Sequence, residues 1–367
     1  MRALTAGGVR AARVRAQGLG DDPATSVLDA VRRVVGLQAQ DVRASRLAVR
    51  ARTIGLTASD VDQAVARRRV VRTWAMRGTL HMLAAEDHGW LVGLLGPYFA
   101  KGLAGRRRAL GLDQDTCARG VEAVRAVLGE AGKLERAELV ERIADHGVVL
   151  DPKSQAPAHL LGYAAMTGVI CRGPETAADE PTYVLVRDWI EEAGDVLPED
   201  AAMARLARRY LAGYGPATAG DLASWSGLPV GRCRQAFADI DAELAPVSAG
   251  GEPAFVLAGT ELDAPGHNGV RLLGHFDTYL LGYHKRRLAV PERFDRRIQT
   301  GGGFIMPAVL DGGRAVGTWR QVRRRNGLVV AVEPFTTIAR RALPALRAEV
   351  ASVGQFLNLP AELDLRR

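Results

Sequence analysis

The segment GLQAQD, residues 36–41, places two glutamines, Gln38 and Gln40, on either side of a single alanine. A glutamine amide is neutral, and it offers one acceptor oxygen and two donor hydrogens. On a helix the two side chains would diverge by about 200°, whereas in an extended segment they share one face. Gly36 before the pair and Asp41 after it, a residue type typical of helix caps, favour an extended link between two helices. The sequence therefore predicts that the two amides converge on one point.

Two converging amides can hold and orient a water molecule, but they cannot take its proton as a carboxylate or an imidazole would. Such a weak device suffices only where the leaving group is already activated. A purine alkylated at N7 or N3 is such a group, because its positive charge makes the glycosidic bond labile. An enzyme then mainly positions the water and supports the cationic sugar. The alternative for the same residues is a polar link whose side chains lie in solvent or cap a helix.

The chain carries a formal net charge of +8, and its predicted pI is near 9.8. Such a balance suits a polyanionic partner, and most of the basic residues are arginines, which pair bidentately with phosphates. Short basic clusters occur at Arg67–Arg69, Arg106–Arg108, Lys285–Arg287 and Arg323–Arg325. A GC-rich coding bias and ordinary solvated faces explain the same pattern equally well, so no cluster identifies a site by itself.

The composition excludes several classes of protein. No apolar run approaches the roughly 20 residues of a membrane span, and the basic N-terminal segment, which we expect to be helical, lacks the apolar core of a secretory signal. The three cysteines, Cys117, Cys171 and Cys233, lie far apart, which favours a reducing cytoplasm over a disulfide framework. No HExxH motif occurs and no two histidines stand four apart, so we expect neither a metal nor another cofactor.

Three stretches of the chain share one order of expected elements: helix, helix, helix, strand, loop, strand. The first runs to about residue 83, with helices over 26–36, over 43–53 and from Thr57, followed by the strand-like VVRTWAMRGTLHML. The second begins near residue 114. In KLERAELVERIADHG one helical face would carry Leu134, Leu139, Val140 and Ile143; SQAPAHLLGYAAMTG is a further helix, and VICRG and PTYVLV are strands.

The third stretch begins near residue 200. AMARLARRYLAGYG, TAGDLASWSG and LPVGRCRQAFADI are expected helices, the second of them opened by Thr218 with Asp221 three residues on. ELAPVSAG and PAFVLAG are expected to form a hairpin. After about residue 268, Gly-Gly turns predict a β-meander, and FTTIARRALPALRAEVASVGQFL closes the chain as an amphipathic helix.

This order is typical of winged helix-turn-helix units, so the predicted fold class is α+β, with three tandem winged helices and a β-rich C-terminal segment. The predicted boundaries are 1–112 for the first unit with its linking helices, 113–198, 199–267, and 268–367 for the β-rich segment and last helix. A winged helix commonly lays its third helix in the major groove, which suits a basic chain, although it also serves in protein–protein modules. A non-catalytic DNA-binding regulator is therefore the second functional hypothesis.

GLQAQD resembles the Gln-apolar-Gln motif of the AlkZ-like winged-helix DNA glycosylases, bacterial enzymes associated with self-resistance to DNA-alkylating antibiotics such as azinomycin B. Four longer segments also resemble that family: TWAMRGTLHML (73–83), YGPATAGDLASWSGL (214–228), HFDTYLLGYHKR (275–286) and FIMPAVLDGGRAVGTWR (304–320). The resemblance spans nearly the whole chain. A related branch, the YcaQ-like enzymes, has aspartate in place of the second glutamine. Gln40 places this sequence in the Gln-Gln branch, and Asp41 is interpreted as a helix cap.

The resemblance implies a C-shaped protein of three winged helices around a basic concave channel. It implies excision of N7-alkylguanines from double-stranded DNA, in some members the unhooking of interstrand crosslinks, and a catalytic role for Gln38 and Gln40. We expect a monomeric, monofunctional cytoplasmic enzyme with no covalent intermediate. A channel that receives DNA with little base flipping would accept bulky adducts that a tight pocket excludes.

Other residues in these segments are candidates with two interpretations each. Thr79 and His81 are expected to line the same cleft, with a structural histidine as the alternative. Contact with phosphate or adduct, or else packing, is expected for four residues: His275, Asp277, Tyr279 and Tyr283. Phosphate contacts are assigned to Lys285, Arg286, Arg287, Arg323, Arg324 and Arg325. Trp74 and Trp319 are expected in the core.

Overall fold

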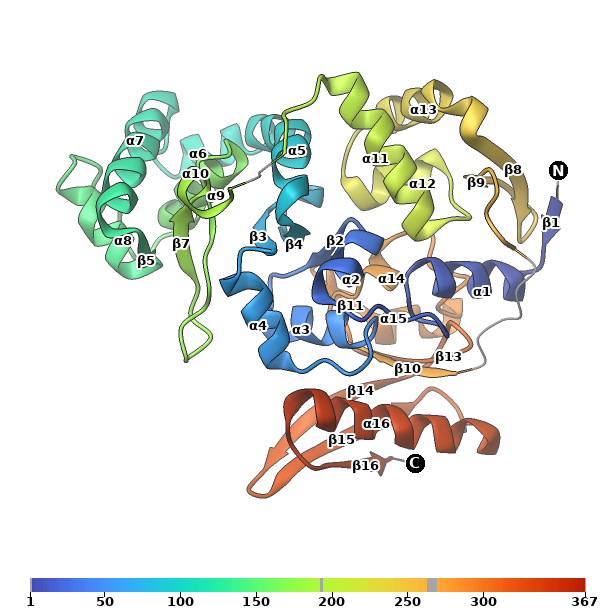
Figure 1. Cartoon of the computed structure of the whole chain (residues 1–367). Helices are drawn as coiled ribbons and strands as arrows, with labels where there is room; N and C mark the ends of the chain where they lie inside the picture. Colours follow the sequence, from blue (N-terminus) through green and yellow to red (C-terminus); the bar gives the residue numbers. More distant parts are fainter. Residues whose placement is uncertain (1, 192–193, 263–268, 367) are drawn as a thin grey trace. The chain divides into compact units, whose positions relative to one another are not determined.

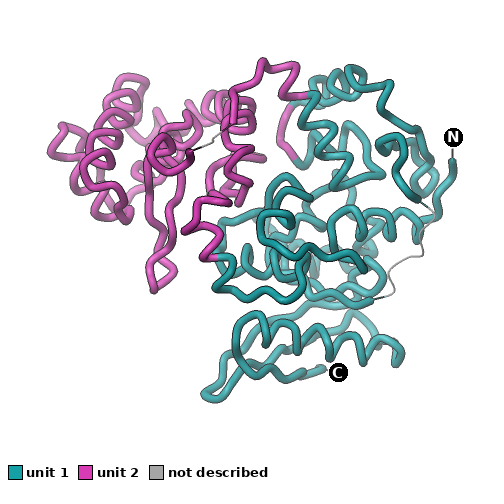
Figure 2. The backbone as a smooth tube through the Cα atoms, viewed as in Figure 1, with its two compact units in different colours: residues 1–61, 204–225, 229–367 teal, residues 62–203, 226–228 magenta. Residues whose placement is uncertain are grey.

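The computed structural model of the chain describes residues 2–191, 194–262 and 269–366. Helices and strands both contribute to the fold, which confirms the α+β class (Figure 1). The chain divides into two compact units, shown in different colours in Figure 2: unit 1 comprises 1–61, 204–225 and 229–367, and unit 2 comprises 62–203 and 226–228. Unit 1 is thus assembled from separate parts of the sequence. The four sequence-based boundaries stay a prediction, and the one at 267–268 lies outside the described residues.

Unit 2 is a sheet covered by helices. Its strands are β3 (Val70–Trp74), β4 (Leu80–Ala84), β5 (Lys133–Glu135), β6 (Ile170–Arg172) and β7 (Thr182–Leu185), which pair antiparallel in the order β4-β3-β6-β7-β5. Its helices are α5 (His88–Gly102), α6 (Ala104–Ala109), α7 (Gln114–Ala131), α8 (Arg136–Ala144), α9 (Ala156–Met166) and α10 (Val186–Trp189). Leu139, Leu160 and Leu161 are fully buried in its core, against which Trp74 packs, as expected.

The segment predicted to be strand-like, VVRTWAMRGTLHML, does form strands, whereas the helical position predicted for Leu134 is not observed. The segment 70–84 is a hairpin, β3–β4, whose tight turn places Arg77 at a φ of 55°. The prediction that Leu134 lies on a helix was wrong, because Leu134 is the central residue of β5 and pairs with Tyr183. The strand is only three residues long and only its central side chain is buried, so it left no periodicity to detect. Leu134 nevertheless enters the same core as Leu139 and Ile143.

Unit 1 contains a five-stranded sheet. Its strands are β10 (Val270–Leu273), β13 (Ala308–Asp311), β14 (Arg314–Arg324), β15 (Gly327–Pro334) and β16 (Ala361–Leu365). The first four form the predicted antiparallel meander, and β16 adds parallel to β15 after α16 (Leu343–Leu357) has crossed over. Trp319 lies in the core between this sheet and α16, as expected, and its indole nitrogen donates to the carbonyl oxygen of Leu273 at 2.7 Å. The strand β16 was not predicted.

A second sheet of unit 1 combines the N-terminal strand with a hairpin formed by residues 244–257. The hairpin β8 (Leu244–Ala249) and β9 (Glu252–Leu257) is the predicted one, and β1 (Arg2–Leu4) pairs parallel to β8. The expected N-terminal helix therefore begins later, as α1 (Ala6–Ala16), where the Thr5 hydroxyl accepts a hydrogen bond from the Gly8 amide. The helices α12 (Ala219–Ser226) and α13 (Val230–Asp239) precede the hairpin.

The remaining elements of unit 1 are short. They are α2 (Val27–Arg33), β2 (Gly36–Gln38), α3 (Val42–Arg50), α14 (Thr278–Leu281), α15 (Asp295–Ile298), β11 (Gln299–Gly301) and β12 (Phe304–Ile305). Two helices, α4 (Ala58–Ala66) and α11 (Glu199–Tyr214), carry the chain from one unit to the other. Among the described residues, no helix combines the length and the apolar character that crossing a membrane would take.

Candidate active site

The two glutamines of GLQAQD meet in the structure. The segment is extended as predicted: Gln38 ends β2, and Ala39, which separates the two glutamines in the sequence, is buried. The Gln38 Nε2 donates a hydrogen bond to the Gln40 Oε1 at 2.6 Å. Gln38 is only 9% exposed whereas Gln40 is exposed, so the pair has one side in the protein and one in solvent. The arrangement suits an oriented water molecule at the surface of unit 1.

Asp41 is the cap of the helix that follows the pair. Its carboxylate accepts a hydrogen bond from the Ala44 amide at 3.0 Å, and α3 begins at the next residue. A carboxylate at this position also offsets the partial positive charge of the helix N-terminus. Because this carboxylate is used by the helix, the structure supports the assignment of Asp41 as a cap.

Residues at the C-terminal end of α11 hold the backbone that precedes Gln38 and Gln40. The Tyr214 hydroxyl donates to the Val34 carbonyl oxygen at 3.0 Å and lies 2.6 Å from the Thr278 hydroxyl. Gly213 packs so closely that a Cβ there would overlap the Arg33 carbonyl oxygen. The backbone just before β2 is therefore held by buried contacts from residues about 180 positions away in sequence.

Tyr214→Phe is expected to destabilise the protein by about 1–3 kcal/mol, because the Val34 carbonyl oxygen loses a buried donor. Urea unfolding would measure this change in the free energy of unfolding. Tyr98→Phe is the matched control, since Tyr98 is 44% exposed. Equal stability of the two variants would contradict a supporting role for Tyr214.

Thr79 and His81 belong to the β3–β4 hairpin of unit 2. The His81 ring is buried and its Nδ1 lies 2.9 Å from the Thr79 carbonyl oxygen, while the Thr79 hydroxyl donates to the Met76 carbonyl oxygen at 3.1 Å. Burial, with a smaller contribution from the Arg77 charge, lowers the pKa of His81 to about 3. A base this weak holds no proton at neutral pH. The geometry thus favours the structural interpretation of His81.

The two buried histidines of unit 2 should make the protein acid-sensitive. Burial lowers the pKa of His81 from 6.5 to about 3 and that of His88 from 6.5 to about 4. Between each lowered pKa and 6.5, the histidine is protonated in the unfolded chain but neutral in the folded one, so the unfolded chain binds more protons. Their contribution to stability is therefore complete above pH 6.5 and is lost as the pH falls. Urea unfolding at a series of pH values should show a shallower decline for His81→Gln than for the wild type, and an unchanged slope would contradict this.

Asp277, Tyr279 and Tyr283 lie in the interior of unit 1. The Asp277 carboxylate accepts two hydrogen bonds of 2.8 Å from the Arg52 guanidinium, and both side chains are fully buried. The Tyr279 hydroxyl donates to the Gly313 carbonyl oxygen at 2.7 Å, and that of Tyr283 to the Tyr214 carbonyl oxygen at 3.0 Å. These groups are hydrogen-bonded within the protein, so the geometry favours the packing alternative for them over contact with phosphate or adduct.

His275 is half-buried beside two phenylalanines, Phe276 and Phe304, which the sequence did not identify as candidates. Its Nδ1 lies 3.2 Å from the Ile305 carbonyl oxygen, and its ring packs at 5.1 Å against Phe304, which is 44% exposed on the short hairpin β11–β12. Phe276 completes the group at 4.9 Å from Phe304. The three glycines before Phe304 were the available signal, because they indicate a turn that presents the next side chain at the surface.

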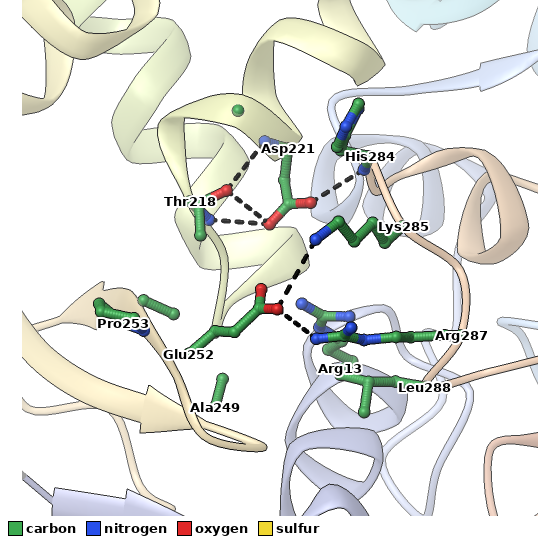
Figure 3. Close-up of a pocket in the computed structure, with 12 residues that line it drawn as sticks. Arg13, Thr218, Asp221, Ala249, Glu252, Pro253, His284, Lys285, Arg287 and Leu288 are labelled. Atoms are coloured by element: carbon green, nitrogen blue, oxygen red, sulfur yellow. Dashed lines mark hydrogen bonds and ion pairs between the residues drawn. The ribbon is translucent and has the colours of Figure 1, made fainter.

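The predicted phosphate-binding residues fall into two groups. Lys285, Arg287 and Glu252 form an exposed ion cluster in unit 1 (Figure 3), and hydrogen bonding to Arg287 holds the pKa of the Glu252 carboxyl below its usual range. Arg286 instead is half-buried, and its Nε donates to the Leu280 carbonyl oxygen at 3.2 Å. The run Arg323–Arg325 is exposed at the end of the β14–β15 hairpin, and none of the three forms an ion pair within the described part of the chain.

Both the sequence and the fold are similar to those of known proteins. The family model "DNA glycosylase AlkZ-like" matches residues 31–356. A curated relative, the interstrand DNA cross-link repair glycosylase of Streptomyces sahachiroi, is 31% identical over 341 residues, which cover 90% of each chain. The solved structure of the Streptomyces sahachiroi DNA glycosylase AlkZ superimposes with a TM-score of 0.83 at 29% identity, over 99% of this chain and 100% of that one. The matched length and the shared fold show that the chain belongs to the AlkZ-like DNA glycosylase family.

Proposed function

We propose that the protein is a monofunctional DNA glycosylase that hydrolyses the N-glycosidic bond of cationic alkylated purines, with a water molecule oriented by Gln38 and Gln40. The observation that carries this proposal is the 2.6 Å contact between the two amides on an extended, solvent-facing link. The proposed substrates are N7-alkylguanines, including bulky antibiotic adducts. Interstrand crosslinks are included because the curated relative is named for their repair.

In the proposed reaction the bond between C1′ of the sugar and the purine nitrogen breaks, and its electron pair neutralises the cationic base. The base therefore leaves without being protonated. Amide oxygens of the pair accept hydrogen bonds from the water and point negative partial charge at the developing sugar cation. The water oxygen then bonds to C1′, and its proton is released to solvent. No lysine is near the motif in sequence, which agrees with hydrolysis without a Schiff base.

The proposal includes the way DNA is bound. Helices α11, α12 and α13 followed by the β8–β9 hairpin have the element order of a winged helix, and we assign two further winged helices to the stretches before residue 198. Double-stranded DNA is the proposed partner of a monomer that works in the bacterial cytoplasm and needs no cofactor. The net charge of +8 supports this partner.

The test is base release. Duplex DNA carrying N7-methylguanine, and a second duplex crosslinked by a bis-alkylating agent, would be incubated with the protein, and abasic sites would be scored by alkaline cleavage. Release from either duplex supports the proposal, and release from the crosslinked duplex alone would mark an enzyme specialised for bulky lesions. Duplex binding without release from either substrate would overturn the proposal in favour of the non-catalytic regulator.

A further inference from the structure

A small pocket of unit 1 lies where α12 begins, beside the turn of the β8–β9 hairpin (Figure 3). Its volume is about 150 Å³. The charged side chains that line it are Arg13, Asp221, Glu252, Lys285 and Arg287. They come from α1, α12, β9 and the segment after α14, so the pocket draws on four separate parts of the sequence.

The two carboxylates of the pocket are used differently. Both oxygens of the Asp221 carboxylate are hydrogen-bonded within the protein. Its Oδ2 accepts from the amide and the hydroxyl of Thr218 at 3.0 and 2.9 Å, and its Oδ1 accepts from the His284 amide at 2.9 Å. Glu252 instead bridges two cations, since its carboxylate lies 3.6 Å from the Lys285 Nζ and also accepts from Arg287. One exposed carboxylate therefore offsets only part of the charge of two exposed cations.

Arg13, which is nearly buried, adds a third positive charge to the lining of the pocket. The side chain is 7% exposed, its guanidinium stacks 3.6 Å over the Tyr283 ring, and its Nε and Nη2 both donate to the Pro216 carbonyl oxygen. Within the described part of the chain, its Nη1 has no hydrogen-bond partner, although the residue lines the pocket. The Arg13 guanidinium therefore keeps one nitrogen that can donate to an anion in the pocket.

We propose that this pocket holds one phosphate of the DNA backbone and that Glu252 is an internal anion which the phosphate displaces. This inference rests on the proposed function, because it takes DNA as the partner. Guanidinium and ammonium donors match phosphate oxygens, and the volume equals that of about five water molecules, which accommodates a phosphate group. Arg13 would contact the phosphate from within, and Lys285 and Arg287 from the rim.

A phosphate that belongs to a polymer suits this site better than a free ion. Lys285 and Arg287 are more than half exposed, so they can reach a strand that runs past the opening. The adjoining turn, Gly250 and Gly251, carries no side chain that would block it. In the free protein Glu252 reduces the positive charge of the rim, which weakens binding to any polyanion.

The test compares Glu252→Gln with Glu243→Gln in equilibrium binding to an undamaged duplex at several salt concentrations. Glu243 pairs with Arg208 on the surface of the same unit, outside the pocket, so its variant removes the same charge from a comparable ion pair. We expect Glu252→Gln to bind about three- to fivefold more tightly, with a salt slope steeper by about one phosphate contact, and Glu243→Gln to bind as the wild type does. Equal behaviour of the two variants would overturn the inference.

A second pair of variants distinguishes a specific phosphate-binding site from a general effect of charge on DNA binding. Arg287→Gln, at an exposed position, should bind the duplex more weakly, and adding it to Glu252→Gln should abolish most of the gain. A gain that persists in the double variant would overturn the displacement of Glu252. Inorganic phosphate serves as the probe for a free ion: if it binds the pocket while duplex affinity is the same in all variants, the assignment to DNA is overturned.

Base release, measured separately, distinguishes this inference from the proposed function. If the wild type releases base and Glu252→Gln and Glu243→Gln bind the duplex equally well, only the inference about the phosphate-binding pocket is overturned. Absence of duplex binding by every form of the protein would overturn both.

Discussion

Replacing either glutamine of the pair with alanine is expected to lower the rate of base release from N7-methylguanine duplex by about a hundredfold or more, while duplex binding is retained. The reason is that each amide supplies a hydrogen bond that fixes the water or faces the developing charge, and losing one preorganised donor or acceptor of this kind costs about 3–4 kcal/mol of transition-state stabilisation. Single-turnover kinetics with excess enzyme would measure the chemical step directly.

The double variant Gln38→Ala/Gln40→Ala tests whether the pair acts as one unit. Because the two amides bind each other at 2.6 Å, removing one also releases the other from its position. The losses should therefore be far from additive, with the double variant scarcely slower than the worse single one. Gln355→Ala, an exposed glutamine on α16, is the control and should release base at the wild-type rate. Wild-type rates in both single variants would refute a catalytic role for the pair.

Asp277→Ala is expected to destabilise the protein by about 3–5 kcal/mol, the second large effect, because it leaves the Arg52 guanidinium charged and buried without its counter-ion. Both side chains of this pair are fully buried. Among the described residues, the other hydrogen bonds of Arg52 go to neutral oxygens, those of the Ala48 carbonyl and the Gln17 amide. Urea unfolding would measure the loss. Glu243→Ala breaks an exposed pair with Arg208, and we expect it to change the free energy of unfolding far less than Asp277→Ala does.

Replacing both partners separates the pair itself from the isolated charge. Arg52→Met combined with Asp277→Leu is expected to recover much of the stability lost in Asp277→Ala, since an apolar pair of similar volume avoids the desolvation of two charges. A double variant as unstable as Asp277→Ala would show that the hydrogen bonds of Arg52 and the cap of α14, rather than the unpaired charge, dominate the loss.

Local features of the fold could be predicted from the sequence where neighbouring residues determine them. Gly36 and Asp41 on either side of QAQ indicated an extended link and a cap, and both are present. The Thr218–Asp221 spacing indicated a capping box, and the Asp221 amide donates to the Thr218 hydroxyl at 3.0 Å. Such features depend on contacts three or four residues apart, which the sequence displays directly.

Features that depend on distant partners could not be predicted in this way. The side chains of Arg52 and Asp277 are 225 positions apart, so nothing near Asp277 distinguished a buried counter-ion from a residue of the cleft. The strand β16, AELDL, alternates apolar and acidic residues over only five positions, which is too short a pattern to identify a strand, and it pairs parallel with β15. Short strands and buried polar groups are set by tertiary context, which a single sequence does not contain.

The division of the chain also bears on when the protein becomes active during its synthesis. Unit 2 is almost entirely one continuous stretch, 62–203, so it can complete its core while the ribosome is still making the rest of the chain. The glutamine pair is made among the first residues. Tyr214, which binds the backbone before the pair, and Thr278, which contacts the Tyr214 hydroxyl, are made much later. We therefore expect the pair to reach its final geometry only near the end of translation, so that truncated chains would carry the motif without the activity.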